Sequence, residues 1–212
     1  GASGFVKTGY LVVVEGIERA GLEKNVAMQQ ELNISTSQIT AADLRDLAPM
    51  VSVSETEVLA WEPESGYADP YLVTTSYASQ ARGLGAEVVQ RNPALGIEVT
   101  GNRVRAVLTQ DGRVETDTVV MAAGPWSKRE MAKVGVDLPL IPVRHQVASL
   151  TRPVEHLPEH PTVGDIAQSF SFRPDGSSMT LMGFGDDEEV DLDTYNQGVD
   201  MTGVAEAMSK LA

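Results

Sequence analysis

The chain has 212 residues, 42% of them hydrophobic and 22% charged, a composition typical of a globular protein able to bury a core. It contains no cysteine, which excludes a disulfide scaffold, a thiolate nucleophile and cysteine-ligated metal sites. Sixteen Lys and Arg against 30 Asp and Glu give a net charge of −14, which disfavours nucleic acid and anionic membrane surfaces as partners.

The N-terminal third predicts a strand followed by two helices. No secretory signal is visible at the start, so the sequence predicts a cytoplasmic location. The β-branched run Tyr10–Val14 predicts a strand almost at once, which favours a piece of a longer protein. Residues 18–32 are compatible with a helix, and Thr40-Ala41-Ala42-Asp43 resembles a capping box that opens a second one. Residues 51–66 are polar, and we expect them to be irregular.

The middle of the chain has the pattern of an α/β protein. Asp69-Pro70 predicts a helix start, and Gly83 and Gly85 end that helix before a strand over residues 86–89. Residues 103–109 and 113–116 form a predicted hairpin around Asp111-Gly112. The run Asp117–Gly124 then predicts a strand that is buried on both faces.

The last third predicts a short helix and a mostly antiparallel region. Ser127 and Glu130 have the spacing of a capping box. A strand over residues 143–150, a loop over 152–164, a hairpin over 168–183 and a final helix over 203–211 follow.

Several catalytic and binding motifs are missing from the sequence. It contains neither the G-x-G-x-x-G of a dinucleotide site nor the G-x-S-x-G of a serine hydrolase. His156 and His160 have ligand-like spacing, but Pro158 between them disfavours a helix, so we interpret them as solvated loop residues. No metal site is predicted.

The segment from Val119 to Ser127 carries the strongest functional signal. Its predicted strand ends in small residues, and Gly124 then allows the backbone to approach a ligand before a helix begins. A simple strand-to-helix turn, in which Gly124 only relieves crowding, explains the same pattern. These residues by themselves leave both interpretations open.

Several segments in order resemble the FAD-dependent oxidoreductases of the D-amino-acid oxidase family. The resemblance covers most of residues 5–185 and is nearest to sarcosine oxidase β subunits, glycine oxidase and the related proline or dimethylglycine dehydrogenases. Its most specific part is Ala122-Ala123-Gly124-Pro125-Trp126-Ser127. The other segments are Gly66-Tyr67-Ala68-Asp69-Pro70, Gly85-Ala86-Glu87-Val88, Arg103-Val104-Arg105-Ala106-Val107, Pro139 to Gln146, and Phe172-Arg173-Pro174-Asp175-Gly176.

The resemblance implies an FAD cofactor and the oxidation of a small amino acid or N-methyl amino acid such as sarcosine, glycine or proline. Hydride passes from the substrate carbon to the flavin, which carries the chemistry. Family positions that line FAD fall on Ala122, Ala123, Gly124 and Trp126, with Ala94 as a weaker match because its neighbours depart from the family pattern.

The resemblance also places candidate residues for the substrate. Arg173 lies close to where relatives have an arginine for the substrate carboxylate, although many have it after the proline. Arg144 and His145 are further candidates, and His145 could tune the protonation of the amine. The alternatives are an ordinary strand-end arginine and a structural histidine.

The implied architecture is part of an FAD-binding α/β layer joined to a mostly antiparallel substrate-domain sheet with helices. Residues 67–135 belong to the FAD-binding part, and 1–66 and 136–212 to the substrate-domain part. Because the pyrophosphate-binding motif is missing, we expect these residues to be the inactive middle of a two-domain flavoprotein, able to self-associate or to join other subunits. The alternatives are a non-catalytic binding module and an alcohol-oxidising flavoprotein of the glycerol-phosphate dehydrogenase type.

Overall fold

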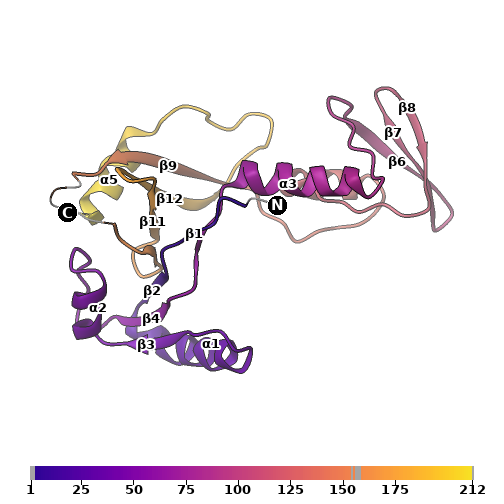
Figure 1. The fold of residues 1–212 in the computed structure, drawn as a ribbon. Coiled ribbons are helices and arrows are strands. Elements are labelled where there is room, and N and C mark those ends of the chain that lie inside the picture. Colours follow the sequence, from indigo (N-terminus) through magenta and orange to yellow (C-terminus); the bar gives the residue numbers. More distant parts are fainter. Residues whose placement is uncertain (1–2, 154, 156–158, 212) are drawn as a thin grey trace. The chain divides into compact units, whose positions relative to one another are not determined.

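The computed structural model describes residues 3–153, 155 and 159–211 (Figure 1). The chain divides into two compact units. The sheet unit comprises Gly1–Tyr77, His145–Asp186 and Gly198–Ala212, and the hairpin unit comprises Ala78–Arg144 and Asp187–Gln197. None of the helices in the described part of the chain combines the length and the apolar character needed to cross a membrane.

The sheet unit is built on seven strands in the order β3-β4-β2-β10-β11-β12-β9. β2 and β10 run parallel, with Leu11 opposite Val163, whereas β3–β4, β2–β4, β10–β11 and β11–β12 are antiparallel. A separate two-stranded ladder pairs β1 (Val6–Lys7) with β5 (Gly66–Tyr67). The seven strands are β2 (Tyr10–Val14), β3 (Ser37–Ile39), β4 (Val58–Glu62), β9 (Val143–Thr151), β10 (Thr162–Asp165), β11 (Phe170–Asp175) and β12 (Met179–Glu189).

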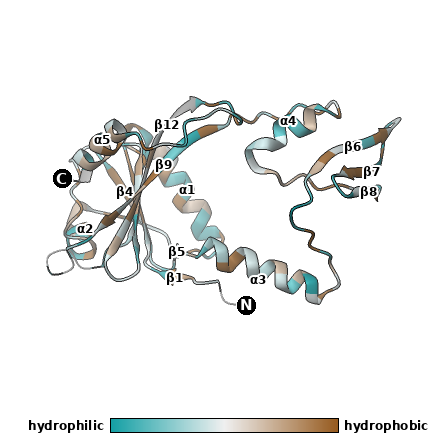
Figure 2. Cartoon of the chain, turned by 90° about the horizontal axis from the view of Figure 1, so that it is seen from above, coloured by the Kyte–Doolittle hydropathy of each residue, from teal (hydrophilic) through white to brown (hydrophobic). Residues whose placement is uncertain are grey.

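Helices cover both faces of this sheet (Figure 2). After a 3-10 turn, η1 (Gly16–Glu18), α1 (Arg19–Glu31) packs Leu22 and Val26 against Val14 of β2. Because side chains alternate along a strand, Leu11 and Val13 face the other side, where α2 (Ala41–Leu47) packs. On that same side, α5 (Met201–Leu211) packs through Ala207 against Phe170, Met182 and Phe184.

The hairpin unit holds a three-stranded antiparallel sheet and a short helix. Its strands are β6 (Ala94–Thr100), β7 (Arg103–Thr109) and β8 (Gly112–Glu115), and α3 (Pro70–Gly83) runs into it from the sheet unit. A 3-10 turn, η2 (Gly124–Trp126), leads directly into α4 (Ser127–Ala132). Among the described residues of the hairpin unit, Ala106 is the only buried hydrophobic one.

Most of the predicted elements are confirmed. Helices lie at 19–31, 41–47, 70–83 and 201–211, and hairpins at 103–115 and 170–189. Thr40 and Asp43 form a true capping box, and Asp69 accepts a hydrogen bond from the backbone N–H of Leu72 at 2.8 Å. The predicted fold class, helices with a mostly antiparallel sheet, is also confirmed.

Five local predictions are wrong. Residues 86–89 and 119–123 form no strand, because no described strand lies beside them to complete a ladder. The stretch 51–66 is not irregular, since it contains the buried strand β4, and the expected loop 152–164 contains the start of β10. Ser127 does not cap α4, because η2 places Trp126 at the cap and Ser127 is already helical.

Candidate functional site

One face of the sheet, along β9–β12, is not covered by α2 or α5. Phe170 and Phe172 of β11 pack against the α5 side, so Ser171 and Arg173 point to the opposite face. In β9, Ala148 and Leu150 pack against the same cluster as Phe170, which places His145 and Val147 on that opposite face too. Val147 is 67% exposed. We call this surface the open face.

A cavity of about 330 Å³ lies on the open face. Glycines allow its lining side chains to lie flat across neighbouring strands: a Cβ at Gly164 would stand 2.3 Å from the Tyr10 hydroxyl, and one at Gly183 would stand 3.1 Å from Ser171 Oγ. The sheet therefore forms a mixed polar and apolar floor. The lining residues include Tyr10, Val147, Thr162, Ser171, Arg173 and Leu181.

Arg173 is the cation of this cavity and is held from two sides. Its Nη1 donates to Asp175 Oδ1 at 3.0 Å and to the Pro174 carbonyl at 2.9 Å. Its guanidinium carbon lies 4.1 Å from the centre of the Tyr67 ring, a cation–π contact. The side chain keeps 26% of its surface exposed. Both of these hydrogen bonds leave from Nη1, one of the three guanidinium nitrogens.

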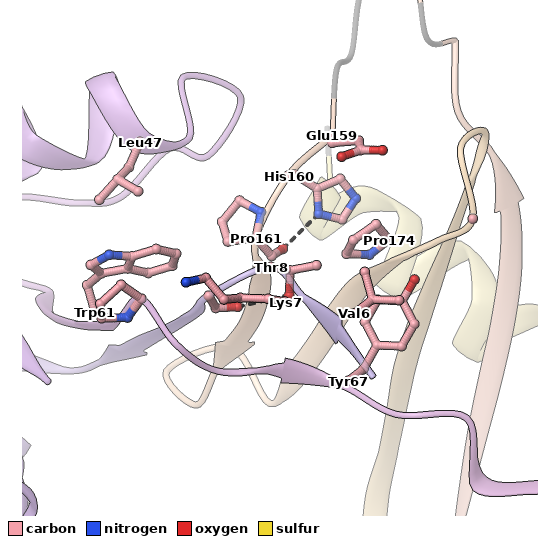
Figure 3. A pocket seen from close by; sticks show the side chains of 13 residues that line it. Val6, Lys7, Thr8, Leu47, Trp61, Tyr67, Glu159, His160, Pro161 and Pro174 are labelled. Carbon is pink, nitrogen blue, oxygen red and sulfur yellow. Dashed lines mark hydrogen bonds between the residues drawn. The ribbon is translucent and has the colours of Figure 1, made fainter. Parts of the chain in front are cut away.

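A second cavity, of about 490 Å³, adjoins this anchor (Figure 3). Tyr67 lines it, so the contact between Tyr67 and Arg173 joins the two cavities. Gly9 also lines it and has a φ of +69°, and a Cβ there would stand 1.8 Å from the Trp61 ring. Lys7 contributes a charge that is paired with Glu64 at 2.7 Å. The other side chains labelled in the figure are apolar or aromatic, except for three polar ones, Thr8, Glu159 and His160.

The structure brings together two of the three candidate substrate residues. Arg173 and His145 share the open face of the sheet unit. Arg144 precedes His145, points away from it by the alternation of β9, belongs to the hairpin unit and has a polar partner. His156, the other half of the histidine pair considered from the sequence, lies outside the described residues.

Two open-face features were not expected from the sequence. Tyr67 reaches Arg173 because β5 pairs with β1, and a two-residue ladder leaves no periodic signal. Tyr10, the first residue of β2, also lines the cavity. The place of Ser171 beside Arg173, by contrast, follows from the period of two along β11.

The candidate FAD residues form an exposed segment of the hairpin unit. Ala122, Ala123 and Gly124 are exposed, and Trp126 keeps 41% of its surface accessible. Gly124 has a φ of +55°, and a Cβ there would meet no atom within 4 Å. A small-residue backbone with open space over it fits contact with a flat cofactor. Ala94 is also exposed and begins β6.

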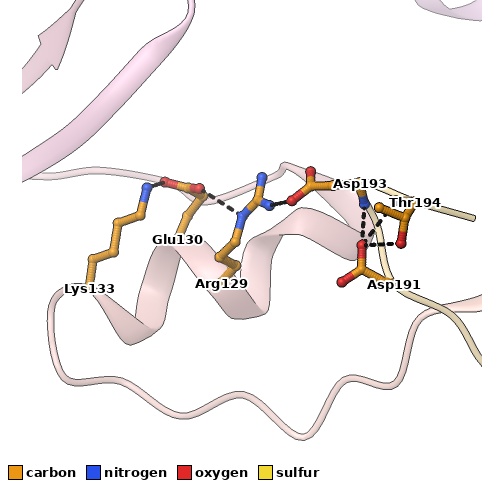
Figure 4. A network of polar contacts seen from close by, with 6 residues as sticks. All are labelled: Arg129, Glu130, Lys133, Asp191, Asp193 and Thr194. Atoms are coloured by element: carbon orange, nitrogen blue, oxygen red, sulfur yellow. Dashed lines mark hydrogen bonds and ion pairs between the residues drawn. The ribbon is translucent and has the colours of Figure 1, made fainter.

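An ion-pair network holds α4 behind this segment (Figure 4). Arg129 Nη1 donates to Asp193 Oδ2 at 2.7 Å, and Lys133 Nζ donates to Glu130 Oε2 at 2.6 Å. Hydrogen bonds from the backbone N–H of Asp193 and from Thr194 lower the pKa of Asp191, which favours the charged form of this carboxyl. The network ties the segment Asp187–Gln197 to α4 within the hairpin unit. Across the described residues, no group of three or more His, Cys, Asp or Glu side chains is arranged to hold a metal ion.

The family model for FAD dependent oxidoreductases, DAO, matches residues 1–212. The chain belongs to this family, whose members are oxidoreductases that depend on FAD.

Its relatives point to the same class. Human sarcosine dehydrogenase is 26% identical over 188 residues, covering 86% of this chain and 20% of the relative. The 4-methylaminobutanoate oxidase (formaldehyde-forming) of Paenarthrobacter nicotinovorans is 27% identical over 164 residues, covering 77% of this chain and 20% of the relative. The chain thus spans about a fifth of the length of these curated relatives.

Solved structures share the fold. L-proline dehydrogenase from P. horikoshii superposes with a TM-score of 0.80 at 24% identity, over 98% of this chain and 56% of that one. Glycine oxidase from Bacillus cereus ATCC 14579 gives 0.70 at 19% identity, over 98% and 55%. The relatives are amino-acid or N-methyl amino-acid oxidases and dehydrogenases.

Proposed function

We propose that this chain works within an FAD-dependent enzyme that oxidises the C–N bond of a small amino acid or N-methyl amino acid. The observation that carries the proposal is Arg173, anchored by Asp175 and Tyr67 at an otherwise mixed polar and apolar cavity on the open face. The names of the relatives, sarcosine dehydrogenase among them, support the same substrate class.

Each residue of the open face then has a physical role. Arg173 binds the substrate carboxylate with the part of its fork that does not bond Asp175, and the Tyr67 ring keeps the guanidinium from swinging away. Val147 and Leu181 contact the apolar part of the substrate. His145, exposed on the same face, is the candidate that sets the protonation of the amine.

In the hairpin unit, Ala122–Trp126 would line the cofactor, with Ala94 as a further contact. FAD, when bound, accepts the hydride that leaves the substrate carbon beside the amine nitrogen. What the chain's own residues contribute is a close backbone approach at Gly124 and an aromatic side chain at Trp126.

We further propose that the 212 residues alone neither hold FAD tightly nor turn over substrate, because the sequence has no G-x-G-x-x-G for the pyrophosphate. The purified chain should be colourless after FAD is added and removed by gel filtration. A yellow protein with a bound-flavin absorbance spectrum would contradict this.

The activity is tested on the protein expressed from its complete reading frame. The purified protein is mixed, in the absence of oxygen, with sarcosine, dimethylglycine, glycine or proline. The loss of the absorbance of oxidised flavin, at about 450 nm, is then followed. We expect at least one to bleach the flavin. Bleaching by glycerol phosphate alone would favour the alcohol-oxidising alternative, and a protein that binds no flavin would favour a non-catalytic module.

A further inference from the structure

A third cavity, of about 350 Å³, lies on the helix-covered face of the sheet, opposite the open face. Leu150 and Phe172 line it from the sheet, Met208 lines it from α5, and Met50 lines it from the segment after α2. Met208 is 41% exposed, which marks the side that opens to solvent. An apolar wall with few polar groups is the usual composition of a small-molecule site.

The main polar group in this wall is a buried arginine. Arg152 is only 5% exposed, and its Nη2 donates to the Ser177 carbonyl at 2.8 Å. Its Nε and Nη1 are shielded from water and donate to no acceptor in the described part of the chain. None of the described carboxylates forms an ion pair with it. Since a guanidinium does not lose its proton, this wall keeps an uncompensated positive charge.

The second polar group is a histidine held in its neutral form. His160 is 7% exposed, and its Nδ1 donates to the Pro161 carbonyl at 2.8 Å. Its Nε2 then accepts from the Thr180 hydroxyl at 2.9 Å. Burial lowers the pKa of His160, and the nearby charge of Arg152 lowers it further. The described lining of the cavity therefore carries a single positive charge.

We propose that this cavity binds a small organic monocarboxylate. The carboxylate pairs with Arg152, and the apolar body of the ligand contacts Met50, Leu150 and Met208. A carboxylate supplies an acceptor oxygen for one of the donors without an acceptor in the described part of the chain, Nη1 or Nε, and one negative charge for one cation, whereas a phosphate dianion would need a second cation. Because both donors are shielded, binding requires the guanidinium to turn toward the ligand as the carboxylate enters.

This site is distinct from the candidate substrate site and does not depend on the proposed oxidation. Phe172 borders both cavities, but its side chain packs on the helix-covered side whereas Arg173 points to the open face, so the two arginines lie on opposite sides of the sheet. The two sites can therefore be tested independently.

The test is a titration of the 212-residue chain with hexanoate, followed by calorimetry and by the imidazole NMR signals of His160. We expect saturable binding that shifts these signals, and much weaker binding of hexanamide, which has the same shape without the charge. Arg152→Met should weaken the hexanoate binding that shifts the His160 signals at least about tenfold, while the matched control Arg113→Met, at an exposed arginine of the hairpin unit, leaves it unchanged. Met208→Trp, which fills the cavity and keeps Arg152, should also abolish binding.

Three results would overturn the proposal: no saturable hexanoate binding, equal binding of hexanamide, or hexanoate binding that Arg152→Met weakens no more than Arg113→Met does. Circular dichroism and a thermal melt check that each variant is folded. If Arg152→Met does not fold, Met208→Trp decides the question, since undiminished hexanoate binding in that variant places the ligand elsewhere.

Discussion

The two units bury their apolar residues to very different degrees. In the sheet unit, Leu11, Leu44 and Met182 are at most 1% exposed, and helices pack on both sides of the sheet. In the hairpin unit, Ala106 is the only buried hydrophobic residue among those described, and Leu84 and Val120 are 89% and 87% exposed. The first unit builds its own core, whereas the second presents apolar side chains that nothing described covers.

This difference divides the candidate sites between a well-packed unit and an exposed one. The candidate substrate face and the Arg152 cavity lie on the well-packed sheet, which can hold side chains in fixed positions. The candidate cofactor segment lies where the chain is exposed. We therefore expect substitutions in the sheet unit to change the free energy of unfolding much more than equivalent substitutions in the hairpin unit.

The largest effect is expected in the central strand. Leu11→Ala removes a side chain that is 1% exposed and leaves a cavity, which should lower the free energy of unfolding by about 3 to 5 kcal/mol. Val120→Ala, at a residue 87% exposed, should change it by less than about 0.5 kcal/mol. Urea unfolding of both variants measures the contrast, and similar losses would show that the hairpin unit also has a core.

A pair of glycines tests the same contrast at the backbone. Both Gly9 and Gly124 have positive φ, but only Gly9 faces a ring, with its built Cβ 1.8 Å from Trp61. Gly9→Ala should cost about 2 to 3 kcal/mol from overpacking added to backbone strain, and Gly124→Ala about 1 kcal/mol from strain alone. Thermal melts compare the two, and an equal shift in Tm would contradict the packing at Trp61.

The capping-box sequences at Thr40, in the sheet unit, and at Ser127, in the hairpin unit, give a third comparison of stability. Thr40→Ala removes a cap that the structure contains and should cost about 1 kcal/mol, which Thr40→Ser restores. Ser127→Ala removes no cap, because the side chain of Ser127 does not bond the start of α4. Urea unfolding measures each change, and a larger loss for Ser127→Ala than for Thr40→Ala would reverse the expected order.

The smallest expected effect is the change in the free energy of unfolding with pH. Burial lowers the pKa of His160 below the 6.5 of an exposed imidazole, so below that pH the unfolded chain binds a proton that the folded chain does not. Stability should therefore fall as the pH drops from about 7.5 to about 5.5, and His160→Gln should flatten this slope. Denaturant unfolding at several pH values measures the slope, and an unchanged slope in the variant would show that another group is responsible.

The sequence predicted what depends on local pattern. Helix starts at Thr40 and Asp69 and the turn at Asp111-Gly112 follow from capping and turn chemistry. Elements that need a distant partner were harder: β4 was missed because its role depends on β2 and β3. The stretches 86–89 and 119–123 have strand-like composition but no neighbouring strand.

The same limit applies to the sites. Arg173 could be proposed from the residues around it, but its contact with Tyr67 depends on the pairing of β1 with β5. Arg152 gave no signal at all in the sequence. Its burial arises only when the end of β9 meets the start of β12 and the segment before β10 brings His160 beside it.

The central claim, that Arg173 holds the substrate carboxylate, is tested most directly by substrate binding in the flavin-loaded protein from the complete reading frame. Rapid mixing without oxygen gives the Kd from the concentration dependence of flavin reduction. Arg173→Met should raise the Kd for the amino acid by about 10- to 100-fold, and much less for its methyl ester, which lacks the carboxylate. An unchanged Kd for the amino acid in Arg173→Met would contradict the account.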